Sequence, residues 1–218
     1  MKIALITDQH LDGRKGSLAF WNYWQQFYDN IFFPTLEKEG IDTVIDLGDT
    51  FDNRKSMDFN TFNRVSDNYF DKLKSYKVHM LLGNHCVYYK NTNKVNSPEL
   101  LLKQYDNITI YSEPEHLKLG SKNFLMLPWI NRENQKEIFK LLETSEADVC
   151  CGHLELSGFE MNPGFLMDHG MDPKLFRRFK RVWSGHYHHK STKGNITYLG
   201  NPYQMFWNDY KDTRGFHI

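Results

Sequence analysis

The sequence reads Val44-Ile45-Asp46-Leu47-Gly48-Asp49 in its first quarter, a largely apolar run followed by glycine and then by a carboxylate. The same order, with a residue able to bind a metal ion after the glycine, recurs in three later stretches. These stretches run from Val78 to His85, from Val149 to His153 and from Val182 to His188. Short apolar runs bounded by glycine predict buried strands.

A fifth apolar run, from Ile3 to Thr7, ends without glycine in Asp8-Gln9-His10. In open α/β sheets, ligands bind just beyond the carboxyl ends of strands, so we expect the five strand ends to meet in one crevice. They would bring together seven side chains, Asp8, His10, Asp49, Asn84, His153, His186 and His188. This combination of carboxylates, an amide and imidazoles predicts a two-metal hydrolytic centre.

The spacing of the predicted ligands suits metal binding. Asp8 and His10 are two residues apart, as are His186 and His188, and side chains at this spacing point to the same side of a strand. A glycine before a ligand lets the backbone approach a metal closely. The carboxylate of Asp49 has two oxygens and could bridge two ions.

The charge of the predicted centre favours an anionic substrate. Two divalent ions bring four positive charges, and Asp8 and Asp49 return only two of them. The site therefore stays positive and would attract a phosphate ester. Ligation rich in imidazole and free of thiolate favours manganese, iron or zinc over magnesium or calcium.

Length, net charge and cysteine content limit the number of domains, the possible partners and the cellular compartment. The 218 residues suffice for one domain, and the formal net charge is zero, so global charge argues neither for nor against a nucleic-acid partner. The three cysteines lack disulfide or zinc-ribbon spacing, which predicts reduced core residues and a cytoplasmic protein. The first apolar run is too short for a signal peptide, and no run is long enough to span a membrane.

Apolar periodicity predicts helices between and around the strands. In the first helix, Phe20, Trp24, Phe27 and Ile31 would form an apolar face, and Pro34 would kink the helix or start a new one. The predicted helices span 17–39, 58–75, 97–104 (with Ser97 as its cap), 133–146 and 172–180. Further short strands are expected at 108–111, 116–119, 124–127, 196–199 and 215–218. The expected fold class is α/β, with a two-sheet β-sandwich core flanked by helices.

The five metal-binding motifs together resemble the calcineurin-like metallophosphoesterase superfamily over essentially the whole chain. Within it, the sequence is similar to the nuclease subunits of double-strand-break repair complexes of the SbcD type, including those of T-even-like phages. The more specific motifs are Asp8-Gln9-His10-Leu11, Gly48-Asp49-Thr50-Phe51-Asp52, Pro128-Trp129, Gly152-His153-Leu154-Glu155 and Gly200-Asn201-Pro202.

The resemblance implies an αββα fold and two divalent ions, with Mn²⁺ expected. It implies that Asp8, His10, Asp49 and His188 hold one ion, and that Asp49, Asn84, His153 and His186 hold the other. It also implies that His85 contacts the scissile phosphate or protonates the departing oxygen, a role that suits a histidine beside a ligand.

The implied activity is two-metal hydrolysis of DNA, as an exonuclease on duplex ends and an endonuclease on single strands. The implied partners are DNA, a second copy of the chain paired through helices 58–75 and 97–104, and an SMC-like ATPase subunit of the SbcC type. No membrane partner is expected. Residues 1–218 would form the nuclease domain, without the capping and ATPase-docking segments that follow it in cellular relatives.

One departure from the family pattern leaves alternatives open. The family usually has an acidic residue directly after the catalytic histidine, and this sequence has Cys86. Cys86 could be a packed core thiol or a redox-sensitive one. A weakened catalytic centre would fit a scaffold that binds DNA ends, whereas the shared ligands would also fit a phosphomonoesterase or protein phosphatase.

Several polar residues could contact DNA. Arg54 and Lys55 follow Asp49, and either phosphate binding or a solvated loop would explain them. Tyr89 follows His85 and could stack on an unpaired base or pack within its loop. Arg177 and Arg178 belong to a dense basic run, which could contact the DNA backbone or form a solvated helix face.

Overall fold

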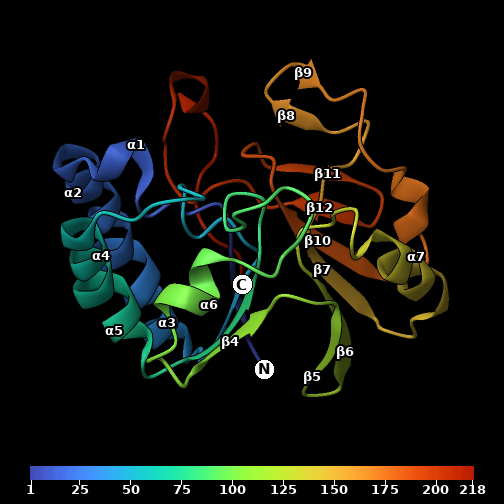
Figure 1. Cartoon of the computed structure of the whole chain (residues 1–218), viewed down its shortest axis with the longest axis horizontal. Helices are drawn as coiled ribbons and strands as arrows, with labels where there is room; N and C mark the ends of the chain where they lie inside the picture. Colours follow the sequence, from blue (N-terminus) through green and yellow to red (C-terminus); the bar gives the residue numbers. More distant parts are fainter.

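The computed structural model describes all 218 residues, and its two β-sheets face each other with helices on the outside (Figure 1). The first sheet has the order β1-β2-β3-β4, and all its strands are parallel. Its strands are β1 (Ala4–Ile6), β2 (Thr43–Asp46), β3 (Lys77–Leu81) and β4 (Ile108–Tyr111). Their carboxyl ends therefore share one edge of the sheet.

The second sheet has six strands in the order β11-β12-β10-β7-β6-β5. Its four inner strands are parallel, and each edge strand pairs antiparallel with its neighbour. The strands are β5 (Glu115–Leu119), β6 (Lys122–Leu127), β7 (Val149–His153), β10 (Arg181–Gly185), β11 (Ser191–Lys193) and β12 (Ile196–Tyr198). A separate hairpin of β8 (Glu160–Asn162) and β9 (Phe165–Leu166) projects beside it (Figure 1).

Most helices cover the outer face of the first sheet, and α7 lies against the second (Figure 1). The α-helices are α1 (Gly13–Gly16), α2 (Leu18–Phe27), α3 (Phe33–Glu39), α4 (Phe59–Val65), α5 (Asp71–Leu73), α6 (Ser97–Leu101) and α7 (Gln135–Thr144). Two π-helical turns, η1 (Tyr28–Phe32) and η2 (Ser66–Phe70), join α2 to α3 and α4 to α5. Two 3₁₀ turns, η3 (Pro173–Phe176) and η4 (Trp207–Asp209), complete the set.

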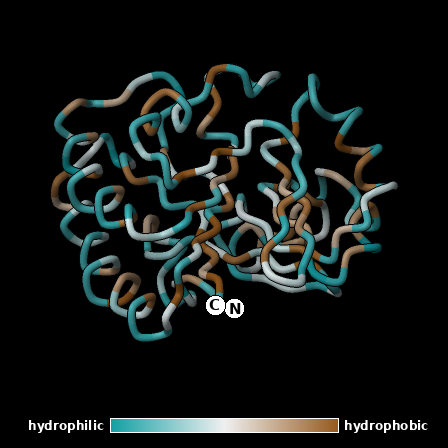
Figure 2. The backbone as a smooth tube through the Cα atoms, turned by 90° about the horizontal axis from the view of Figure 1, so that it is seen from below, coloured by the Kyte–Doolittle hydropathy of each residue, from teal (hydrophilic) through white to brown (hydrophobic).

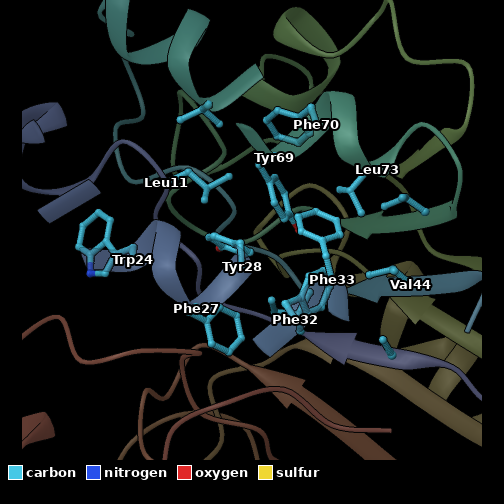
Figure 3. Packing of buried hydrophobic residues seen from close by; sticks show 14 of the residues in the cluster. Leu11, Trp24, Phe27, Tyr28, Phe32, Phe33, Val44, Tyr69, Phe70 and Leu73 are labelled. Carbon is cyan, nitrogen blue, oxygen red and sulfur yellow. The ribbon is translucent and has the colours of Figure 1, made fainter. Parts of the chain in front are cut away.

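Strand alternation builds three apolar layers. Val44 faces the helices, where it packs with aromatic residues such as Tyr28 and Phe32 (Figure 3), while Ile45 faces the space between the sheets. Cys151 also lies between the sheets, and Cys150 faces the layer under α7. This helix–sheet–sheet–helix order confirms the predicted fold class, since successive strand residues point to opposite faces.

The first predicted helix is present from 18 to 39, but its inner face is shifted from the prediction. Trp21, Trp24 and Tyr28 are buried, whereas Phe20 and Ile31 are exposed. Pro34 is the second residue of α3, which follows a π turn, so its missing N–H falls where the helical bonding pattern already changes.

Other elements are shorter than predicted. The helix predicted at 172–180 is only η3, because the Asn195 side-chain amide donates to the carbonyls of Phe176 and Phe179 and so competes for helical acceptors. The helix predicted at 97–104 ends at Leu101, and Asn96 rather than Ser97 caps it, accepting from the Glu99 N–H at 2.9 Å.

The two chain ends lie side by side (Figure 2). The strand predicted at 215–218 is a single antiparallel bridge between Leu5 and His217, with backbone hydrogen bonds of 2.8 and 3.0 Å. The C-terminal residues thereby flank the edge strand β1. Among the helices, none has the length and apolar character needed to cross a membrane.

Candidate metal centre

The strand ends of both sheets bring the predicted ligands into two clusters. Asp8, His10 and His188 form the first cluster, and Asp49, His153 and His186 form the second; within each, the potential ligand atoms lie within 4.8 Å of one another. Asn84 joins the second cluster, because its Oδ1 is 3.1 Å from His153 Nε2 and 2.9 Å from His186 Nδ1. All seven predicted ligands therefore meet at one site.

Four of these residues have a left-handed backbone. The φ angles of Asp8, His10, Asp49 and His186 are 51°, 46°, 52° and 90°. Such angles are uncommon for residues other than glycine, cost on the order of 1–3 kcal/mol each and cluster at functional sites. Backbone hydrogen bonds of 2.9 Å from Asp8 N–H to the Gly48 carbonyl and from His10 N–H to the Asp49 carbonyl hold these turns together.

Glycines before the ligands give the space for close approach. A Cβ at Gly83 would lie 2.5 Å from the backbone nitrogen of Asp49, and one at Gly185 would lie 2.9 Å from Asp8 Oδ2. Any side chain at either position would push a predicted ligand out of place. The geometry therefore agrees with the reason that the sequence suggests for these glycines.

Hydrogen bonds fix the orientation of two ligands. His153 Nδ1 lies 2.8 Å from the Leu47 carbonyl, to which it can only donate, so Nε2 carries the lone pair that faces the cluster. Asp8 accepts from the His186 N–H at 3.0 Å and from the Thr7 hydroxyl at 2.8 Å. These bonds connect the end of β7 to the end of β2, and the end of β10 to the end of β1.

Burial and the neighbouring ionisable groups shift the pKa values of three predicted ligands strongly. Burial alone would raise the pKa of Asp49, but His153 and then His10 outweigh it and hold that pKa far below its usual value. Burial opposes protonation of His153, yet Asp49 raises its pKa to about 9. Burial, reinforced by His153, lowers the pKa of His186 to about 3.

The residues present fit divalent metal ions. His10 Nε2 and His188 Nε2 face each other at 3.3 Å within the first cluster, where a cation could accept both lone pairs. Oxygen and imidazole donors without thiolate suit manganese, iron or zinc. The clusters could thus hold ions at two adjacent positions.

His85 lies beside the site, outside the two clusters of predicted ligands, and it forms a third group with His10 and Asp52 whose potential ligand atoms lie within 4.8 Å of one another. Its N–H donates to Asp49 Oδ1 at 2.7 Å, and its Nδ1 lies 2.7 Å from the Asp52 carbonyl, to which it donates. This tautomer leaves Nε2 as the free nitrogen of a ring whose side chain is 38% exposed. His85 can therefore reach a substrate while its backbone fixes the position of Asp49.

Comparison with known proteins identifies the family. The family model described as "Calcineurin-like phosphoesterase" matches residues 1–202. The chain belongs to this family. The phosphoesterase is 36% identical over 182 residues, 83% of its length, to exonuclease subunit 1 of Enterobacteria phage T4. A viral relative from Invertebrate iridescent virus 3, named only as a phosphoesterase, is 28% identical over 213 residues, 94% of the chain.

The phosphoesterase spans about half the length of these curated relatives, 53% of the T4 protein and 58% of the iridescent-virus protein. Among solved structures, a dimetal phosphatase from Danio rerio superposes with a TM-score of 0.55 at 14% identity. That comparison covers 91% of this chain and 87% of the other. At this identity the likeness concerns the fold, which agrees with the two-sheet architecture.

Asp52 belongs to the site, although the sequence gave it no individual role beyond its place at the end of a specific motif. Its Oδ1 lies 3.1 Å from His10 Nδ1 and 3.5 Å from His85 Nδ1, and the nearby His10 lowers the pKa of this carboxyl. Asp12 accepts from the Asp52 N–H at 2.5 Å and so anchors this loop. The spacing Asp49-x-x-Asp52 was the available signal, but an aspartate in a polar loop is usually solvated.

Cys86 occupies a different environment from the acid that it replaces in the sequence pattern. Its side chain is fully buried with Leu82 and Val87, and burial raises the pKa of its thiol to about 12. A thiol of this kind stays protonated and is shielded from oxidants. The interpretation of Cys86 as a packed core residue is therefore confirmed, and Asp52 supplies a carboxylate beside His85.

The candidate DNA contacts lie in two places. Arg54 and Lys55 line a small cavity with Tyr88, and Lys55 Nζ lies 5.5 Å from the centre of the Tyr88 ring. The neighbouring Tyr89 is 53% exposed. Arg54 and Lys55 come shortly after Asp52 in the chain, and Tyr88 and Tyr89 come shortly after His85, so both loops start at the metal centre.

Arg177 and Arg178 line another cavity, which α7 and η3 form and which includes none of the predicted ligands. They precede Arg181, at the start of β10, whereas the ligands follow Gly185, at its end. Their contact with DNA stays a prediction.

Trp129 and Glu155 also adjoin the second cluster, although the sequence gave them no individual role. The Trp129 ring lies 5.3 Å from the ring of His186, and Glu155 Oε1 lies 4.0 Å from His186 Nε2. Only the specific motifs Pro128-Trp129 and His153-Leu154-Glu155 pointed to these positions. Both side chains therefore border the space where a substrate would meet this cluster.

Proposed function

We propose that this phosphoesterase is a DNA nuclease that hydrolyses phosphodiesters with two divalent ions, acting as an exonuclease on duplex ends and an endonuclease on single strands. The observation that carries the proposal is the pair of adjacent ligand clusters with His85 exposed beside them. The name of the T4 relative, exonuclease subunit 1, supports DNA as the substrate. Recombination or double-strand-break repair is the corresponding process.

Asp8, His10 and His188 would hold one ion, and Asn84, His153 and His186 would hold the other, with Asp49 bridging them. When bound, such ions neutralise the phosphate and supply an activated water. The N and O donors suit manganese, iron or zinc, and Mn²⁺ is the ion proposed here.

His85 is the residue of the chain that would act on the leaving group. The Asp52 carbonyl holds the His85 Nδ1 proton, so the ring presents Nε2 towards the substrate. A protonated Nε2 would donate to the departing oxygen, and general acid catalysis of this kind typically contributes about 10²–10⁴-fold to the rate. Asp52 and Asp49 keep the ring in position through the carbonyl and the backbone N–H of His85.

Arg54, Lys55 and Tyr89 would bind the strand next to the metals, because Arg54 and Lys55 line one cavity with Tyr88, whose ring centre lies 4.6 Å from that of the exposed Tyr89. Arginine grips phosphate bidentately, and aromatic rings stack on unpaired bases.

The partners proposed for the nuclease are a second copy of the chain and an SMC-like ATPase. The word subunit in the name of the T4 relative supports an assembly. The helical run from α4 to α5 and the helix α6 would pair the two copies. Exposed apolar side chains on these segments support that surface, with Phe59 89% and Leu100 60% exposed.

The proposal is tested with end-labelled duplex DNA and circular single-stranded DNA, each incubated with manganese, with magnesium or with chelator. Cutting of both substrates that needs manganese and is lost on chelation is the expected result. A chromogenic phosphomonoester hydrolysed faster than either DNA would instead identify a phosphatase. Binding of DNA ends without cutting by the metal-loaded protein would favour a scaffold.

A further inference from the structure

An open cavity of about 570 Å³ adjoins the second ligand cluster. His153 lines both the cavity and the cluster, so the two spaces are continuous. Trp129 forms another part of the wall and packs on the ring of His186 at 5.3 Å. The volume lies in the range of small-molecule sites.

The interior of the cavity is apolar on one side. Ile130, Phe139, Met171 and Leu175 line it, and all four are only partly buried, packing on the core layer under α7. They come from the segment before α7, from α7 itself and from the segment around η3. Exposed aromatic and aliphatic side chains in a concave site offer a surface on which a flat ring can stack.

The rim of the cavity carries two cations without acidic partners. Lys90 and Arg132 line the opening, both are exposed, and neither takes part in any ion pair, unlike the nearby Lys94 with Glu133. Their charges complement the phosphates that flank a nucleoside. The lining also contains two carboxylates, Glu155 and Asp172, and the amide of Gln135, all of which can accept hydrogen bonds from base amino groups.

We infer that this cavity binds the nucleoside attached to the scissile phosphate. Its base lies against the apolar side formed by Phe139, Met171 and Leu175, and Lys90 and Arg132 meet the adjoining phosphates. The inference rests on the proposed nuclease function and specifies how that enzyme holds its substrate strand. A phosphatase for small esters would not need an apolar cavity beside the metals that can accept a base.

The test measures binding to the manganese-loaded protein by isothermal titration calorimetry. The ligands are the 5′- and 3′-monophosphates of deoxyadenosine, and deoxyribose 5-phosphate, which has the phosphate and sugar but no base. At least one nucleotide should bind about tenfold or more tightly than the sugar phosphate, as expected for one stacked base. Equal affinity of all three ligands would overturn the inference without any variant.

A pair of leucine variants then locates the site. Leu175→Trp occupies space on the apolar side of the cavity where the base would lie, and it should reduce the nucleotide preference to within about twofold, with the affinity for the sugar phosphate unchanged. Leu166→Trp introduces the same ring on the β8–β9 hairpin, where Leu166 is 56% exposed, and should keep the full preference. Retention of the preference in Leu175→Trp would contradict the assignment of this cavity.

The experiments distinguish failure of the proposed nuclease function from failure of the proposed base-binding cavity. An enzyme that prefers nucleotide over sugar phosphate but cuts no DNA would contradict the nuclease and leave the base-binding cavity supported. An enzyme that cuts DNA but shows no nucleotide preference would retain the nuclease function and remove the subsite.

Discussion

At the scale of single residues, His85 is the side chain on which the proposed chemistry depends. We predict that His85→Asn binds both metal ions but loses about 10²–10⁴-fold in DNA cleavage, because the ring lies outside both ligand sets. Metal content by mass spectrometry and cleavage of labelled DNA would check it. Asp8→Asn is the control, and it should lose metal as well as activity. An empty site in His85→Asn would contradict the assigned role.

Cys86 gives a second prediction at this scale. Cys86→Asp places a carboxylate in a fully buried position, so it should lower the free energy of unfolding by at least about 2 kcal/mol without raising turnover. Chemical denaturation measures the first effect, with Cys86→Ala as the control for loss of the thiol alone. A large gain in cleavage by Cys86→Asp would mean that Asp52 does not replace the acidic residue that the family usually has after the catalytic histidine.

The predicted ligands could be recognised from the sequence because each follows a short apolar run, and such runs end at the same edge of parallel strands. Asp52 and Trp129 could not be placed in the same way. Asp52 acquires its role from a turn that brings it 3.1 Å from His10, and Trp129 from packing on His186, contacts that join distant parts of the chain.

At the scale of elements, glycines at the strand ends determine how closely the sheets approach. We predict that Gly185→Ala lowers manganese affinity by at least about tenfold, because its Cβ would overlap the Thr7 hydroxyl, which donates to Asp8, and would lie 2.9 Å from Asp8 Oδ2 itself. Manganese titration followed by electron paramagnetic resonance measures this change. Gly194→Ala, in the turn between β11 and β12 with no atom within 4 Å of the new Cβ, should bind manganese as the parent does.

Strands were easier to predict than helix details. The apolar runs at 108–111 and 124–127 lie within β4 and β6, because their pattern needs no knowledge of the surroundings. The π turn before Pro34 and the short η3 depend on tertiary contacts, including the hydrogen bonds from Asn195 to Phe176 and Phe179. Sequence periodicity contains no signal for such competition.

At the scale of the whole molecule, the exposed apolar residues of α4 and α6 predict pairing of two copies. Leu100→Glu should shift the protein from dimer to monomer in light scattering, because a charge at the centre of an apolar interface is costly to desolvate. Leu166→Glu, which changes a leucine of similar exposure on the β8–β9 hairpin, should remain dimeric. An unchanged dimer in Leu100→Glu would refute this interface.

The most direct test of a two-metal nuclease follows cleavage of circular single-stranded DNA while manganese is added to metal-free protein. Two ions should bind per chain, and cutting should rise mainly as the second ion binds, because both clusters are needed around one phosphate. Full activity with one ion per chain would contradict the two-metal centre. The absence of cutting with two ions bound would contradict the nuclease itself.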